Sequence, residues 1–204
     1  MTMATQDSEG AVEGSATESG ELGDAPVEAA RRGSPRAFAD LISRYDVRLR
    51  GLAYRLLQDQ EAMQDAMQDA YVAAFRGLPA FRGDAAVETW LYRIVYTTCL
   101  RHISRRRDPH VVYGAETAAS AADPADGVAL RQDIATALSH LPVDQRAAVL
   151  LVDGQGFSYK EAGEVLGVPS GTVASRLSCG RASLRAMLGI AHTVEVARDA
   201  AVKR

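Results

Sequence analysis

The sequence is poor in cysteine and in long apolar runs, and each shortage excludes a class of protein. Its two cysteines, Cys99 and Cys179, are too few and too far apart for a disulfide framework or a cysteine-rich zinc site. The first residues lack the basic and apolar segments of a signal peptide. No stretch approaches the roughly 18 consecutive apolar residues of a membrane span. We therefore expect a cytoplasmic protein without metal, cofactor or membrane insertion.

Acidic side chains are concentrated at the N-terminus. The 204 residues carry 23 basic and 26 acidic side chains, a net charge of −3. Residues 1–30 hold seven of the acids and no Lys or Arg, so the remainder carries +4. Residues 1–25 offer little to bury and are predicted to be a disordered acidic tail. The remaining chain is basic enough to meet an anionic partner.

The first half of the chain has a helical period and no strand-like alternation. Ser34-Pro35 is a good helix start, and apolar side chains from Phe38 to Leu56 then recur every three or four residues, which predicts one helix of about six turns. A second helix is predicted from Asp59 to about Gly77 and a third from about Val87 to Arg107. Together they predict a small helical domain over residues 26–107.

The second half contains a linker and a second helical domain. Residues 108–126 hold two prolines, four acids and no Lys or Arg, which is typical of a flexible linker. Helical periodicity returns over residues 127–189, and residues 190–204 form a C-terminal tail. The predicted fold is therefore all-α, with two small helical domains joined by a flexible linker.

The strongest local pattern is a helix-turn-helix. Ser158 and Glu161 have the spacing of a capping box, and Gly167 can end the short helix that follows. Ser170 can then cap a longer helix, which a helix-turn-helix places in the DNA major groove. Residues 165–194 contain three arginines and no acid, so one face can meet phosphates. A plain helical hairpin with a solvated basic face is the alternative, and Gly180 should weaken the longer helix by about 1 kcal/mol relative to alanine.

Two helices of the first domain carry opposite charges. Basic side chains between Glu88 and Asp108 alternate with Tyr92 and Tyr96, a pattern that suits single-stranded nucleic acid. Trp90 has helical spacing from Ile94, so we expect it in the core. The preceding helix has acids at four-residue steps, which are either solvated or dock a basic protein surface. They are Glu61, Asp65 and Asp69.

Several segments resemble the extracytoplasmic-function (ECF, group 4) sigma factors of the sigma-70 family, and details resemble their sigma-M-like subgroup. The stretches 35–38, 65–69, 81–87 (FRGDAAV) and 90–94 (WLYRI) look like sigma region 2. The stretches 141–149 (LPVDQRAAV) and 171–177 (GTVASRL) look like sigma region 4. The resemblance covers about 35–107 and 128–188, in the family's order. It implies a non-enzymatic subunit that binds core RNA polymerase and directs promoter-specific initiation.

The resemblance also implies roles for individual residues. Region 2 would bind the β′ clamp helices and the −10 element, and region 4 would bind the β flap and the −35 element. The polymerase-binding residues would be Asp65, Gln68 and Asp69. The −10 contacts would be Asp84, Val87, Glu88, Tyr92, Arg93, Tyr96, Thr97 and Arg101. The −35 contacts would be Thr172, Ser175, Arg176, Ser178 and Arg181.

The linker's reach favours a polymerase subunit over a free-standing regulator. The 19 residues 108–126 have a relaxed span of about 24 Å, less than the roughly 34 Å of one DNA turn. Something must therefore hold the domains apart, and polymerase would do so. Two alternatives remain: a stand-alone dimeric helix-turn-helix regulator, and an enzyme with metal on the acidic helix. The family resemblance also implies an anti-sigma factor that silences the chain.

Overall fold

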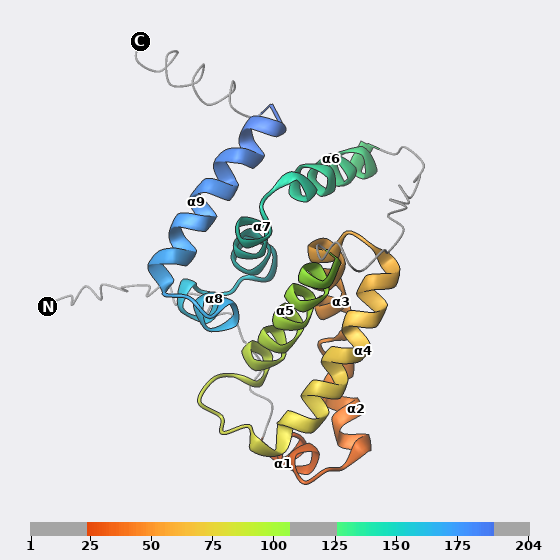
Figure 1. Cartoon of the computed structure of the whole chain (residues 1–204). Helices are drawn as coiled ribbons and strands as arrows, with labels where there is room; N and C mark the ends of the chain where they lie inside the picture. The colour runs from red at the N-terminus through yellow and green to blue at the C-terminus, as the bar shows by residue number, and fades with distance from the viewer. Residues whose placement is uncertain (1–23, 107–125, 190–204) are drawn as a thin grey trace, which may run out of the picture.

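The computed structural model describes residues 24–106 and 126–189, and every regular element in these ranges is helical (Figure 1). The all-α prediction is confirmed. The predicted tails and linker fall almost entirely outside the described residues. Within the described ranges, no helix combines the length and apolarity that a membrane crossing needs.

Two groups of helices make up the fold, called here the first domain (24–106) and the second domain (126–189). The first domain contains α1 (Asp24–Arg31), α2 (Pro35–Ser43), α3 (Asp46–Leu57), α4 (Gln60–Gly77), a 3₁₀ turn η1 (Leu78–Ala80) and α5 (Val87–Arg106). The second contains α6 (Asp126–His140), α7 (Val143–Val149), a π-helical turn η2 (Leu150–Gly154), α8 (Tyr159–Leu166) and α9 (Ser170–Met187).

The long first helix predicted from Phe38 to Leu56 is wrong, because the structure divides it into α2 and α3. The chain bends at Arg44 and Tyr45, and the two halves of the apolar stripe bury in different places. Leu41 packs with α1 and η1 in a small separate cluster, whereas Leu49 belongs to the main core. The three- and four-residue spacing continues across the bend, so periodicity alone could not reveal it.

The predicted second and third helices are confirmed as α4 and α5. Asp59 caps α4, since its carboxylate accepts a hydrogen bond from the Ala62 N–H at 2.8 Å. The same carboxylate pairs with Arg106, so it joins the start of α4 to the end of α5. The Ala62 hydrogen bond and the Arg106 guanidinium lower the pKa of Asp59. Trp90 is partly buried and packs on Phe81, with ring centroids 5.2 Å apart.

One capping expectation in α9 is wrong, and the structure adds a packing reason for its glycine. The helix begins at Ser170 itself, with Pro169 at the N-cap position and no side-chain cap, so Ser170 does not cap it. Gly180 is buried where α9 crosses α7, and a Cβ there would lie 2.8 Å from Val149 Cγ2. The glycine still lowers helix propensity, but the close approach of the two helices requires it.

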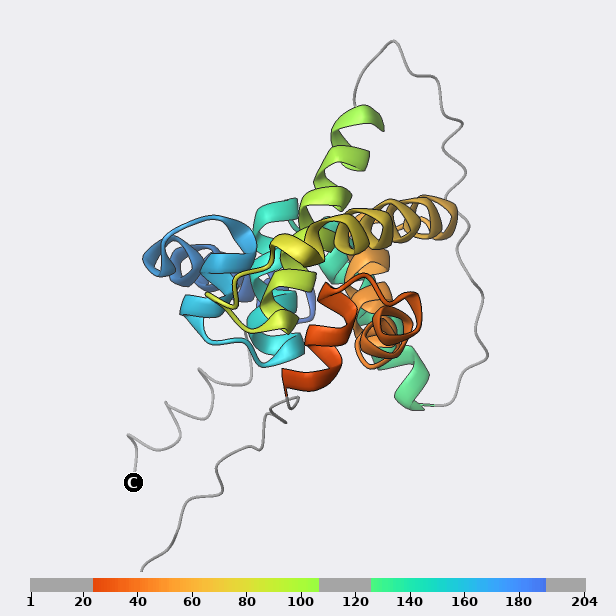
Figure 2. The same cartoon turned by 90° about the horizontal axis from the view of Figure 1, so that it is seen from below.

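The two domains pack against each other and share one apolar core. Helices α8 and α5 lie side by side in Figures 1 and 2, and α3 contacts both α6 and α7. The rings of Tyr92 on α5 and Phe157 before α8 meet edge to face, with centroids 4.8 Å apart. We call this packing of the second domain on α3 and α5 the closed arrangement.

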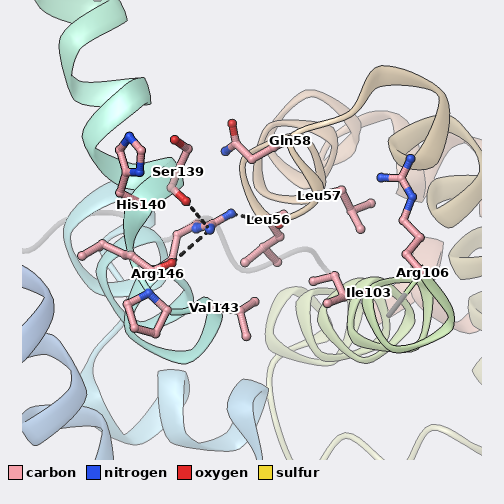
Figure 3. Close-up of a pocket in the computed structure, with 11 residues that line it drawn as sticks. Leu56, Leu57, Gln58, Ile103, Arg106, Ser139, His140, Val143 and Arg146 are labelled. Carbon is pink, nitrogen blue, oxygen red and sulfur yellow. Dashed lines mark hydrogen bonds between the residues drawn. The ribbon is translucent and has the colours of Figure 1, made fainter. Parts of the chain in front are cut away.

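Arg146 joins the domains through backbone carbonyls (Figure 3). Its guanidinium donates to the carbonyls of Arg55 and Leu56, both at 3.1 Å, in the last turn of α3. It also donates to the carbonyls of Ser139 (2.8 Å) and Leu141 (3.0 Å), at the end of α6. A cation is favourable beside the C-terminal carbonyls of helices, which lack partners inside the helix. Burial lowers the pKa of Arg146.

Candidate nucleic-acid interface

Helix α8, a glycine turn and α9 form the predicted helix-turn-helix. The Ser158 hydroxyl accepts a hydrogen bond from the Glu161 N–H at 3.2 Å, and the Glu161 carboxylate accepts one from the Ser158 N–H at 2.8 Å. The Ser158 hydroxyl and N–H lower the pKa of Glu161. Gly167 ends α8 with φ at 69°, and a Cβ on Gly163 would lie 2.7 Å from the Val168 carbonyl oxygen. These two glycines permit the tight turn.

The uncharged side chains predicted to read the −35 element differ in exposure. Ser175 and Ser178 are exposed on α9, whereas Thr172 is partly buried. The Ser175 hydroxyl donates to the Thr172 carbonyl at 2.9 Å. Ser175 and Ser178 are thus more accessible to a base edge than Thr172.

The two arginines predicted for the −35 element each face an acid of the same domain. Arg176 pairs with Asp144 at 2.9 Å, and Arg181 Nε donates to the Asp153 carboxylate at 3.0 Å. Exposed pairs of this kind contribute little net free energy, so a phosphate could replace either carboxylate. Sequence spacing could not reveal these pairs, because the acids lie about 30 residues earlier in the chain.

The acidic face of α4 is exposed as the sequence predicts. Asp65, Gln68 and Asp69 all face solvent, and Asp69 lies 2.9 Å from His102 of α5. Two apolar side chains continue this surface and were missed by the sequence reasoning. They are Val72, 44% exposed, and Phe75, 41% exposed. Their helical spacing from Gln68 was the available signal.

No group of three His, Cys, Asp or Glu side chains within 24–106 and 126–189 could hold a metal ion.

The side chains predicted to meet the −10 element fall into exposed and buried groups. Asp84, Arg93 and Arg101 are exposed, and Val87 and Glu88 are partly buried where α5 begins. Thr97 is partly buried and donates its hydroxyl to the backbone of its own helix, at 2.9 Å from the Arg93 oxygen. The exposed members can meet nucleic acid in the closed arrangement without any movement.

Tyr92 and Tyr96 form the buried group. They are 0% and 3% exposed, because the second domain covers this side of α5. Burial raises the pKa of the Tyr92 phenol to about 12 and raises that of Tyr96. In the closed arrangement neither ring can stack on a base, so a role at the −10 element requires the domains to separate.

A second surface of the second domain is an apolar groove between α6 and α9. Leu130, Ile134 and Met187 line it, and their side chains are 59%, 39% and 43% exposed. Met187 lies 11 residues along α9 from Arg176, which is about 17 Å of helix. The groove is therefore well separated from Arg176, whereas Arg181 lies six residues, or about 9 Å of helix, from Met187.

Comparison with known families matches both domains in order. Residues 41–108 match the family described as Sigma-70 region 2, and residues 131–184 match the family described as Sigma-70, region 4. The ECF RNA polymerase sigma factor SigM of Mycobacterium tuberculosis H37Rv is 41% identical over 174 residues, which cover 85% of this chain and 88% of the relative. The RNA polymerase sigma-H factor of Pseudomonas aeruginosa is 34% identical over 172 residues, covering 78% of this chain and 89% of the relative.

Two solved structures are also similar to this chain over most of its length. CnrH in complex with the cytosolic domain of CnrY superposes with a TM-score of 0.63 at 27% identity, covering 81% of this chain and 96% of that chain. The sigma factor RpoE of Bartonella quintana, in complex with the anti-sigma factor NepR, gives a TM-score of 0.60 at 27% identity, covering 75% of this chain and 97% of that chain.

Proposed function

The chain belongs to the sigma-70 family as an extracytoplasmic-function sigma factor, and on this premise we propose how its surfaces divide the work of initiation. A sigma factor is not an enzyme: it binds core RNA polymerase and directs the polymerase to promoters. The observation that carries the assignment is the exposed acidic face of α4 in the first domain, combined with a helix-turn-helix in the second.

The α4 face is the proposed docking surface for the β′ clamp helices of polymerase. Asp65, Gln68 and Asp69 supply negative charge and hydrogen-bonding groups, and Val72 and Phe75 supply exposed apolar area beside them. An interface of this composition gains free energy from apolar burial and specificity from the charges. The surface is accessible in the closed arrangement.

Helix α5 and the loop before it are the proposed −10 surface. Arg93 and Arg101 can neutralise phosphates, and Tyr92 and Tyr96 can stack on unpaired bases once the second domain moves away. This proposed surface is completed by Asp84 in the loop before α5, by Val87 and Glu88 at its start, and by Thr97 in its middle.

The N-terminal part of α9 is the proposed −35 surface. Ser175 and Ser178 can bond base edges in the major groove, with Thr172 beside them. Arg176 and Arg181 can contact phosphates after exchanging their carboxylate partners for DNA. The groove between α6 and α9 lies toward the other end of α9, about 17 Å of helix from Arg176, and we assign it to the β flap, so that the domain can hold DNA and polymerase together.

The family also suggests how the chain is regulated and where in the cell it acts. The RpoE structure contains an anti-sigma factor, and we propose that an anti-sigma factor also silences this chain. The chain acts in the cytoplasm, where core polymerase and the chromosome meet. Polymerase docking also holds the two domains at the separation that promoter elements require, which the predicted linker does not reach when relaxed.

Transcription with purified components tests the function. The full chain is added to core polymerase from the same organism on a genomic DNA library, and new transcript starts are mapped. We expect transcripts from a limited set of starts, each preceded by shared −35 and −10 sequences. A stand-alone regulator would instead bind a palindromic site as a dimer without polymerase and yield no new starts.

A further inference from the structure

A cavity of about 610 Å³ lies where the ends of α3, α5 and α6 meet the start of α7 (Figure 3). We call it the interdomain cavity, because α3 and α5 belong to the first domain and α6 and α7 to the second. Its volume is within the roughly 300–1,000 Å³ of small-molecule sites. Its apolar lining consists of Leu56, Leu57, Ile103, Leu141, Pro142 and Val143. The described lining contains no Phe, Tyr or Trp on which a nucleotide base could stack.

The ionisable side chains that line the interdomain cavity are all of basic type. Arg106 comes from α5, His140 from α6 and Arg146 from α7, and no acidic side chain is among the described lining residues. Arg106 is paired with Asp59, which lies outside the lining. Arg146 has only backbone carbonyls as hydrogen-bond acceptors among the described residues. The cavity therefore contains a cation without a carboxylate partner in the described part of the chain.

Arg146 also keeps one hydrogen-bond donor unused. The residue is 9% exposed, and its Nε–H is buried with no acceptor in the described ranges. Its other two guanidinium nitrogens donate to the carbonyls at the ends of α3 and α6 (Figure 3). A buried donor without an acceptor is costly, and buried polar groups in proteins nearly always have a partner. An oxygen atom of a ligand in the cavity is the partner that this N–H lacks.

The backbone at the edge of the cavity is also unusual. Gln58 lines the cavity and is the only non-glycine residue with a positive φ, 56°, in the part of the chain that the structure describes. It ends α3, so the last carbonyls of that helix are left for Arg146. Left-handed backbone is uncommon for residues other than glycine, and such positions cluster at functional sites and ligand contacts.

We propose that the interdomain cavity binds a small anionic amphiphile, a carboxylate on an aliphatic chain. Arg146 and Arg106 receive the carboxylate, and the apolar lining receives the chain. A small polar anion leaves the apolar side chains without a partner, and a neutral amphiphile provides no charge for Arg146. A ligand with both parts matches the lining, because small-molecule sites combine a mostly apolar surface with a few convergent polar groups. None of the residues assigned above to the −10 or −35 element lines this cavity.

Binding in this cavity is linked to the packing of the domains. Both domains supply the lining, so the complete site exists only while they are packed together. A ligand that binds one of two states stabilises that state by mass action. The amphiphile therefore opposes the separation of the domains and lowers initiation, a consequence that rests on the proposed function.

Calorimetric titration of the full chain with octanoate tests the site. Octanoate should bind saturably and at least about tenfold more tightly than 1-octanol, because charge-assisted hydrogen bonds are roughly twice as strong as neutral ones. Ile103→Trp fills the apolar part of the cavity and should weaken octanoate binding at least about tenfold. Val47→Trp, at an 82% exposed position of α3, should bind like the wild type. Circular dichroism checks that both variants keep the fold.

A charge variant tests the site without filling it. Arg106→Gln should weaken octanoate binding about threefold and leave 1-octanol binding unchanged, because only the carboxylate loses a partner. Equal losses for both probes would show that Arg106 acts through the shape of the cavity, and this overturns the assignment of the carboxylate.

Three further outcomes also decide the proposal. Saturable binding that Ile103→Trp removes and Val47→Trp keeps supports it. Weak, unsaturable uptake that is equal in all variants marks octanoate as an adventitious additive only and overturns it. Residues 107–125 follow Arg106 directly and are the alternative occupant. If octanoate binds only after Val111, Val112 and Tyr113 are replaced by serine, the cavity belongs to the chain's own segment and the proposal is overturned.

Transcription with core polymerase separates this proposal from the proposed function. Initiation by the wild type should fall as octanoate saturates the chain, and initiation by Ile103→Trp should not respond. An equal fall with Ile103→Trp shows that octanoate acts on polymerase and overturns the link to initiation. Normal initiation by a chain that binds no octanoate overturns the site and leaves the proposed function intact. Octanoate binding by a chain that never initiates has the reverse meaning.

Discussion

Helices α4 and α5 pack against each other in the first domain but present their proposed binding surfaces differently. The acidic and apolar residues of α4 that we assign to polymerase face solvent. On α5, Tyr92 and Tyr96 lie beneath the second domain, although Arg93 and Arg101 remain exposed. On the proposed assignments, the free chain presents its polymerase-binding surface, whereas the two tyrosines of its −10 surface stay covered.

On the proposed assignments, this difference orders the steps of initiation. Polymerase can dock on α4 while the domains remain packed together, and its contacts with the second domain can then supply the free energy of separation. A ligand shifts a conformational equilibrium by its difference in affinity for the two states. Covering α5 also limits unproductive binding to nucleic acid by the free chain.

The largest effect is expected when the contact of the second domain with the end of α3 is removed at Arg146. Arg146→Met should lower the free energy of unfolding by about 3 kcal/mol or more, because four backbone carbonyls at two helix ends lose their donor. Urea unfolding followed by circular dichroism measures the change. Arg131→Met, on the exposed side of α6, is the control and should change stability by less than about 0.5 kcal/mol. Equal effects of both substitutions would show that Arg146 does not hold these helix ends.

The next largest effect is expected at the exposed acidic face of α4. Asp65→Arg should weaken binding to core polymerase by about 1.4–2.8 kcal/mol, or roughly 10- to 100-fold, because it reverses a charge at the proposed interface. Fluorescence titration with labelled chain gives the affinity, and circular dichroism checks that the fold is kept. Asp40→Arg makes the same change on the exposed side of α2 and should leave the affinity intact. Wild-type affinity in Asp65→Arg would take α4 off the polymerase interface.

Much of the local structure could be predicted because its signals are local. The cap at Asp59, the capping box at Ser158 and Glu161, and the turn at Gly167 each depend on residues within one turn of helix. The exposed acids of α4 were equally readable, since four-residue spacing places them on one face.

Features that depend on contacts distant in sequence were not predictable. The bend between α2 and α3 keeps the apolar spacing, and the roles of Gly180 and Arg146 depend on helices that pack only in the tertiary fold. The burial of Tyr92 depends on the second domain, more than 60 positions away at Gln155. Pattern analysis of a single helix contains no information on what covers it.

A smaller effect is expected when high pH ionises Tyr92, the α5 side chain that the second domain covers. Burial raises the Tyr92 pKa from 10.0 to about 12. The free energy that the neutral, buried phenol contributes to the closed arrangement is therefore fully present below pH 10 and is lost as the pH approaches 12. At pH 11 the loss is about 1 kcal/mol. Energy transfer between a dye on Cys179 and a dye on an Arg76→Cys substitution, both at exposed positions, should fall over this interval, and less steeply in Tyr92→Phe. Tyr54→Phe, at a half-exposed site on α3, should follow the wild type.

The smallest effect is expected at the proposed −35 surface, in the salt dependence of promoter binding. Arg176→Ala should weaken promoter binding by the polymerase complex by about 0.5–1 kcal/mol and reduce the slope of log K against log salt by about 0.9, as expected for one lost phosphate contact. Asp144→Asn should do the opposite, because it frees Arg176 from its carboxylate partner at 2.9 Å. If both variants keep the wild-type slope, Arg176 serves the packing of α9 on α7 through its pair with Asp144 and does not contact phosphate.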